Sequence, residues 1–165
     1  MRYAQIREMD ITNGKGIACS LFVQGCSHHC KGCFNPETWD FNSGKEWTQD
    51  IENKFIELCK RPHIDCVSIL GGEPFDQNEH IYWLLKKIKL EVNKPLYLWS
   101  GYEYEYLINK DIPRDCLMEN LIDYLIDGKF QLDKRDLSLK LRGSSNQRII
   151  DVQESLSQNK VITIP

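Results

Sequence analysis

Residues 17–33 read IACSLFVQGCSHHCKGC, and the expected fold follows from this stretch. Its first part, Ile17 to Val23, is short and almost wholly apolar, which is typical of a strand buried on both faces. Gly25 ends the run, and the loop after it contains three cysteines, at positions 26, 30 and 33. The stretch therefore predicts a buried strand whose carboxyl end carries a group of thiols.

The same pattern recurs along the chain, because other short apolar strands also stop at turns that contain glycine or polar residues. The predicted strands and their turns are Cys66 to Leu70 before Gly71-Gly72-Glu73-Pro74, Pro95 to Trp99 before Ser100-Gly101-Tyr102, and Leu121 to Ile126 before Asp127-Gly128-Lys129. Helical spacing of apolar residues predicts helices at Thr48 to Cys59 and around Ile81, Leu84, Leu85 and Ile88. Further strands are expected at Arg148 to Val152 and Val161 to Ile164.

Strands that alternate with helices predict an α/β fold with mostly parallel strands. A full eight-stranded barrel takes about 250 residues, so a chain of 165 residues can form only a partial, open (β/α) barrel. The carboxyl ends of parallel strands build the active site in such folds. We therefore expect the four turns to meet at one rim.

The composition fits one domain spanning residues 1–165, with 41% hydrophobic and 27% charged residues. The net charge is -3 and no basic stripe stands out, so nucleic acid is not an expected partner. Residues 1–10 are charged and contain no apolar signal core. No apolar run approaches the roughly 18 residues of a membrane helix. We expect a cytoplasmic protein without a membrane partner.

The seven cysteines divide into two groups. An odd number argues against a disulfide framework. Four of them lie in apolar stretches and are expected to be small buried hydrophobes: Cys19, Cys59, Cys66 and Cys116. The other three lie within eight residues of one another, which suits one compact soft-metal centre.

Three kinds of centre fit the spacing of Cys26, Cys30 and Cys33. A 4Fe-4S cluster with three cysteine ligands has one open iron that can bind a substrate, and we favour this possibility. A structural zinc site would need His28 or His29 as the fourth ligand, and an electron-transfer cluster normally uses four cysteines. We expect at least one of the two histidines to face water.

From Cys26 to Cys33 the chain resembles the radical S-adenosylmethionine enzymes, whose signature is C-x3-C-x2-C after the first strand of a partial (β/α) barrel. Gly71-Gly72-Glu73-Pro74 resembles their second motif, which holds the amino group of the methionine moiety. A closer match is to the activating proteins of anaerobic (class III) ribonucleotide reductase. The similar blocks are Asn13 to Gly16, Gly25 to Trp39, Leu98 to Tyr102, Ile126 to Phe130 and Arg142 to Arg148.

This resemblance implies that Cys26, Cys30 and Cys33 hold a 4Fe-4S cluster that binds and reductively cleaves S-adenosylmethionine. The resulting 5′-deoxyadenosyl radical takes a hydrogen atom from a glycine of anaerobic ribonucleoside-triphosphate reductase, on its large subunit. A low-potential electron donor such as flavodoxin or ferredoxin is also implied. The expected cofactor-binding residues are Phe34, Gly71, Gly72, Glu73, Pro74, Ser100, Asp127 and Lys129. Gly32 stands where many members carry an aromatic residue, so which residue covers the adenine stays open.

Each motif also has an ordinary structural explanation. Residues 71–74 can form a plain strand-to-helix turn, and Asp127-Gly128 is a common turn pair. Arg142 to Arg148 is either a solvated polar loop or a segment that closes the site or docks the reductase. Two rival functions follow: a small-molecule radical enzyme such as 7-carboxy-7-deazaguanine synthase, and a zinc-stabilised binding module.

Overall fold

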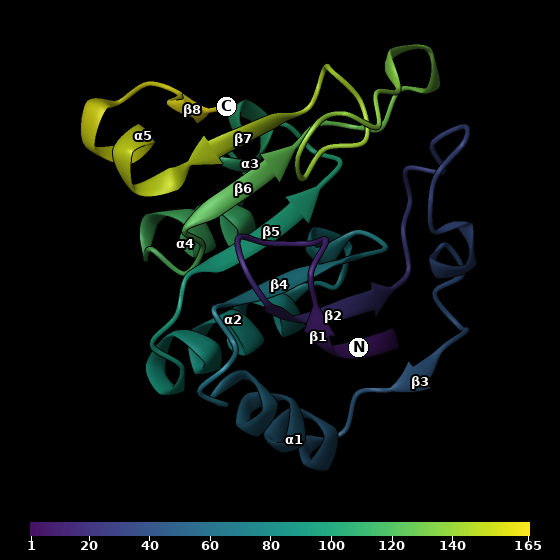
Figure 1. Cartoon of the computed structure of the whole chain (residues 1–165), viewed down its shortest axis with the longest axis vertical. Helices are drawn as coiled ribbons and strands as arrows, with labels where there is room; N and C mark the ends of the chain where they lie inside the picture. The colour runs from purple at the N-terminus through teal and green to yellow at the C-terminus, as the bar shows by residue number, and fades with distance from the viewer.

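The computed structural model describes residues 1–165. One sheet of eight strands runs through it in the order β3-β1-β2-β4-β5-β6-β7-β8 (Figure 1). The strands are β1 (Arg2–Asp10), β2 (Ala18–Gln24), β3 (Lys45–Glu46), β4 (Cys66–Gly71), β5 (Leu96–Ser100), β6 (Tyr124–Asp127), β7 (Arg148–Asp151) and β8 (Thr163–Ile164). Every strand predicted from the sequence is present, with bounds that differ from the prediction by up to three residues.

The middle of the sheet is parallel and its two sides are antiparallel. Strands β2, β4, β5 and β6 pair in parallel, whereas β1, β3, β7 and β8 pair with their neighbours antiparallel. The structure confirms a mixed α/β fold, but the expected predominance of parallel strands holds only in the middle. The reason is that β1 leads to β2, and β6 to β7, without a crossover helix, and only parallel neighbours need such a crossover.

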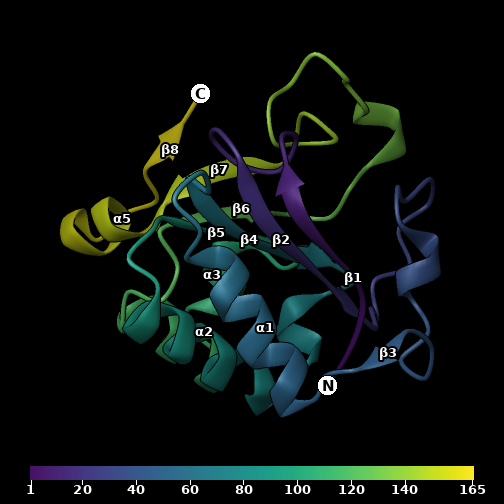
Figure 2. The same cartoon turned by 60° about the horizontal axis from the view of Figure 1, so that its bottom comes forward.

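The helices pack against one face of this sheet. They are α1 (Gln49–Cys59), α2 (Glu79–Glu91), α3 (Tyr104–Leu107), α4 (Asp111–Met118) and α5 (Val152–Gln158). Helix α1 is capped by Thr48, whose side chain accepts a hydrogen bond of 3.2 Å from the Ile51 amide. Figure 2 shows α1 and α2 below the sheet. None of the helices combines the length and apolar character needed to cross a membrane.

Strand alternation sends two different sets of side chains to the two faces of the sheet. Toward the helices, residues such as Leu21, Ile69 and Leu98 enter a core of 27 buried residues. The opposite face carries a smaller buried cluster of Ala18, Cys66, Tyr97, Ile126 and Ile149. Two irregular segments lie over this second face: residues 11–17, and residues 128–147, which we call the strap (Figure 2).

Side-chain hydrogen bonds fix both segments to the sheet. The indole of Trp99 on β5 donates to the Leu141 carbonyl in the strap at 2.8 Å. Buried Asp10 accepts bonds of 2.8 Å from the Ser20 hydroxyl on β2 and from Nδ2 of the Asn13 side chain. These bonds, together with the backbone bond from Thr12 at 3.0 Å, lower the pKa of Asp10 although burial raises it. A cavity lies between the sheet and these two segments.

The longest strand, β1, was not expected from the sequence. Its nine residues read RYAQIREMD and contain no apolar run. Two irregularities in its pairing with β2, between Tyr3 and Gln5 and between Arg7 and Asp10, shift the residues that face the core. Regular alternation, which identifies a half-buried strand, is lost for this reason.

Candidate functional site

A cavity of about 450 Å³ opens where the central parallel strands end. This volume falls in the range of sites for small molecules. The loop after β2, the turn after β4, the end of β5 and the strap all contribute to its wall. The four turns that the sequence predicted to meet at one rim are thus close together.

The three clustered cysteines all line this cavity. Cys26 is buried, whereas Cys30 and Cys33 are partly exposed. Burial raises the pKa of the Cys26 thiol to about 11, and burial together with nearby Cys33 raises the pKa of Cys30. The metal-free thiols of Cys26 and Cys30 are therefore protonated at neutral pH, and binding of iron must release their protons.

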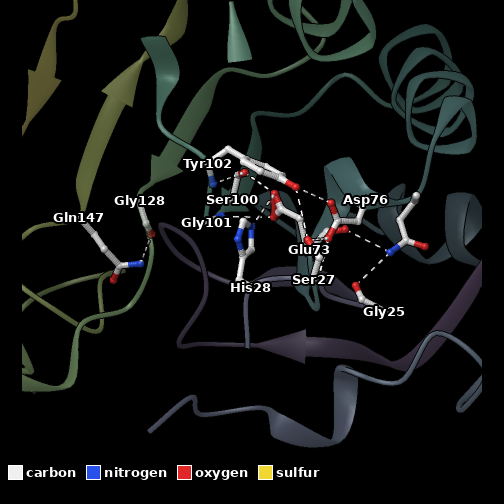
Figure 3. A network of polar contacts seen from close by, with 11 residues as sticks. Gly25, Ser27, His28, Glu73, Asp76, Ser100, Gly101, Tyr102, Gly128 and Gln147 are labelled. Atoms are coloured by element: carbon white, nitrogen blue, oxygen red, sulfur yellow. Dashed lines mark hydrogen bonds and ion pairs between the residues drawn. The ribbon is translucent and has the colours of Figure 1, made fainter. Parts of the chain in front are cut away.

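The cysteine loop is fixed to the turn after β4 by one carboxylate (Figure 3). Asp76, at the end of the 3-10 helix Pro74–Asp76, accepts bonds from the Ser27 amide at 2.8 Å and from its hydroxyl at 2.7 Å. Its other oxygen accepts from the Tyr102 hydroxyl at 2.7 Å. Asp76 thus joins the cysteine loop to the segment that follows β5.

Backbone contacts join the same segments still more closely. The Glu73 amide and the Gln77 side chain donate to the Gly25 carbonyl at 2.9 and 3.2 Å. A Cβ on Gly72 would lie 2.4 Å from that carbonyl oxygen. Gly71 has a φ of +110°, and a Cβ there would lie 2.7 Å from the backbone of β2 at Phe22. Both glycines are therefore required for the close approach of two backbones.

Glu73 lines the cavity and is buried, and burial raises the pKa of its carboxyl group. The Ser100 hydroxyl donates to its Oε1, and the Gly101 amide donates to its Oε2 at 3.2 Å. Nε2 of His28 lies 3.8 Å from Oε1. The carboxyl group thus brings the end of β5 and the cysteine loop together (Figure 3).

His28 itself is oriented toward the site. Its side chain is only 6% exposed, packs edge-on against the Tyr102 ring, and has an Nε2 with no hydrogen-bond partner. His29 is exposed and stacks on Trp39. The expectation that at least one histidine faces water therefore holds for His29.

Most of the residues predicted from the sequence line the cavity, and two do not. Those in its wall are Cys26, Cys30, Cys33, Phe34, Gly71, Gly72, Glu73, Ser100 and Lys129. Pro74 instead begins the 3-10 helix and is buried beneath the turn. Asp127 is also outside the wall, because its carboxylate accepts bonds from Arg148 at 2.6 and 3.0 Å and from the Tyr104 amide at 2.8 Å. The structure does not bring these two residues to the cavity.

Several cavity residues were not identified from the sequence as contacts. Trp39, Trp99 and Gln147 belong to this group, as do His28 and Arg142, whose roles were left open. Most of them fall in blocks that resemble the activating proteins, which was the only available signal. Nε1 of Trp39, Nε of Arg142 and Nε2 of His28 are buried without a hydrogen-bond partner. Unpaired buried groups around one cavity are expected where a polar ligand binds.

The donor set fits an iron–sulfur cluster. No three His, Cys, Asp or Glu side chains are placed to hold a single metal ion. A cluster contains several irons, so its thiolates need not converge on one point. Cys26, Cys30 and Cys33 could bind different irons of a cluster from the wall that they share.

Comparison with known proteins gives the class first. A family model described as "4Fe-4S single cluster domain" matches residues 12–150. This match places the chain among single-cluster iron–sulfur proteins, in agreement with the prediction from the cysteine spacing. It does not favour the zinc-stabilised module.

The particular family follows from curated relatives. The chain is 40% identical over 152 residues to the anaerobic ribonucleoside-triphosphate reductase-activating protein of Salmonella typhi, covering 89% of this chain and 96% of the relative. It is 39% identical over 154 residues to the protein of the same name from Vibrio cholerae, covering 90% of this chain and 97% of the relative. It is 38% identical over 152 residues to the one from Escherichia coli K12, covering 89% of this chain and 96% of the relative. The chain belongs to the family of anaerobic ribonucleoside-triphosphate reductase-activating proteins, which confirms the resemblance seen in its motifs.

Proposed function

We propose that this protein activates anaerobic ribonucleoside-triphosphate reductase by reductive cleavage of S-adenosylmethionine. The observation that carries the proposal is that three cysteine thiols and residues 71–73 of the glycine-rich turn share one cavity. When bound, a reduced 4Fe-4S cluster supplies the electron that splits S-adenosylmethionine into methionine and a 5′-deoxyadenosyl radical, which takes a hydrogen atom from a reductase glycine. We also propose that the mixed sheet, which is parallel in its middle, is an open partial barrel of the radical S-adenosylmethionine type.

The chain's own residues would bind and orient the sulfonium substrate. Gly71 and Gly72 keep side chains away from the turn, so its backbone can approach the methionine moiety. Lys129, an exposed cation in the wall, suits the methionine carboxylate. Phe34 lines the wall and offers an aromatic surface to the adenine.

Ser100 receives a different role from the cofactor contact expected from the sequence. Its hydroxyl donates to Glu73 and accepts from the Tyr102 amide at 3.1 Å. Both bonds remain within the protein, so we propose that Ser100 positions Glu73. Glu73 in turn holds the end of β5 beside the cysteine loop.

The proposed reaction also requires an electron donor and a reducing compartment. We propose that a low-potential protein such as flavodoxin or ferredoxin would supply the electron. All seven cysteines are free thiols, as is usual in the reducing cytoplasm, where we propose that the protein acts.

The proposal is tested by anaerobic purification with analysis of iron, sulfide and zinc, followed by an assay of S-adenosylmethionine cleavage. We expect about four irons and four sulfides per chain, which is the composition of a 4Fe-4S cluster. We also expect 5′-deoxyadenosine and methionine in equal amounts after reduction. Stoichiometric zinc without iron would contradict the cluster. Turnover of a small purine-like substrate without reductase would favour the 7-carboxy-7-deazaguanine type of enzyme.

A further inference from the structure

The strap has features that the cavity alone does not explain. It contains 20 residues between β6 and β7, with only one short 3-10 helix, Leu132–Lys134. Irregular segments longer than about 12–15 residues are uncommon in compact domains and are usually functional. Residues 131–138 are exposed without interruption.

The strap nevertheless has a defined conformation, held by internal hydrogen bonds. Gln147 accepts from the Gly143 amide at 2.8 Å and donates to the Gly128 carbonyl at 2.9 Å. The Ser145 amide donates to the Lys134 carbonyl at 2.9 Å. These bonds hold the strap folded back on itself. Its exposed side chains are therefore attached to a backbone of fixed conformation.

Apolar side chains of the strap line the cavity or lie against the cysteine loop beside it. Leu137 is 75% exposed and lines the cavity, and Leu132 is 42% exposed and packs against Gly32 in the cysteine loop. Phe34, which is 51% exposed, packs against Phe130 of the strap at 4.9 Å between ring centroids. Exposed apolar side chains that adjoin a site are typical of surfaces that bind another protein.

The charge of the strap differs in sign from that of the whole chain. It carries five basic residues, Lys129, Lys134, Arg135, Lys140 and Arg142, and two acidic ones, Asp133 and Asp136. Its formal charge is thus +3, although the chain has a net charge of -3. The side chains of Lys134 and Lys140 are exposed, and neither makes a hydrogen bond or ion pair within the protein.

We propose that the strap is the docking surface for the glycine-bearing segment of the reductase, and that this segment presents acidic and apolar side chains to it. The inference rests on the proposed function, which requires the reductase glycine to reach the cavity that the strap borders. The apolar side chains of the strap would hold the segment over the cavity. The basic side chains would attract it and set its register.

The test compares two variants of the complete, cluster-loaded protein, each with two lysines replaced by glutamate. Lys134→Glu/Lys140→Glu alters the strap without touching the cavity wall. Lys54→Glu/Lys89→Glu makes the same change of charge at exposed lysines of α1 and α2. Anaerobic binding to the cognate reductase is measured at low and high salt, together with S-adenosylmethionine cleavage by the reduced protein alone.

We expect the strap variant to bind the reductase about tenfold more weakly at low salt and the difference to shrink at high salt, since exposed charges are screened. Its cleavage of S-adenosylmethionine without reductase should equal that of the wild type and of the control variant. Equal binding by the strap variant, or equal loss in both variants, would overturn the inference and leave the proposed function intact.

If a partner other than the reductase binds the strap, the variants give different results. If the strap variant loses only its reduction by flavodoxin, the surface serves the electron donor and the inference is wrong. If reversal changes only the sedimentation of the protein alone, the surface joins two copies of this chain and the inference is also wrong. A wild-type protein that cleaves S-adenosylmethionine but neither binds nor activates the reductase would overturn the proposed function and the inference together.

Discussion

Removal of the Asp76 carboxylate should loosen the cysteine loop. Asp76→Ala removes the two bonds from Ser27 and the one from Tyr102. Hydrogen bonds to a charged group contribute about 1.5–3 kcal/mol each, but Ser27 is exposed and water replaces part of this. We therefore expect a total loss of about 2–3 kcal/mol, which corresponds to roughly 30- to 150-fold in the opening equilibrium of the loop.

The assay is the rate at which a chelator removes iron from the reconstituted protein. If the loop must open before iron leaves, the rate should rise by roughly the same factor as the opening equilibrium. Tyr102→Phe removes one of the three bonds and should give a smaller rise. Asp133→Asn, at an exposed carboxylate without a side-chain partner, is the matched control. Iron release from Asp76→Ala at the wild-type rate would refute the role given to this carboxylate.

Three further predictions follow from the site. Cys26→Ala, Cys30→Ala or Cys33→Ala should abolish or damage the cluster, whereas Cys59→Ala should keep near-normal iron, and the reverse result would contradict the ligand assignment. Gly72→Val should lower both the iron content and the affinity for S-adenosylmethionine, because its Cβ would press on the Gly25 carbonyl. Unchanged iron content by metal analysis together with unchanged affinity by calorimetry would contradict this. The lowered pKa of Asp10 means that its stabilising contribution is present above the unfolded value of about 3.9 and is lost as the pH falls through the lowered pKa. Asp10→Asn should therefore reduce the free energy of unfolding by about 1–3 kcal/mol at pH 7 and by less at pH 3, which urea denaturation can measure; an equal loss at both values would contradict the linkage.

The prediction from sequence succeeded where a pattern is local. Each buried strand of the parallel region is a short apolar run followed by a turn, and the cysteine triad lies within a single loop. The rule that the carboxyl ends of parallel strands meet is enough to place the turn at residues 71–74 beside the thiols. These elements need no knowledge of long-range pairing.

The failures all depend on long-range pairing. Asp127 was expected to contact the ligand. The antiparallel register of β6 and β7 places Arg148 directly opposite Asp127, and the Arg148 guanidinium donates to the Asp127 carboxylate. The role of Asp76 was not foreseen, because its partners lie 49 and 26 positions away. His28 and His29 are equivalent in the sequence, and only the fold turns one into the cavity and leaves the other exposed.

The central claim is that the protein generates a glycyl radical on the reductase, and electron paramagnetic resonance tests it most directly. The reduced, S-adenosylmethionine-loaded protein is mixed without oxygen with the cognate anaerobic ribonucleoside-triphosphate reductase. We expect a carbon-centred doublet on the reductase, which collapses when its glycines are deuterated, and accumulation of 5′-deoxyadenosine in step with the radical. Cleavage of S-adenosylmethionine without that doublet on a competent reductase would contradict the account.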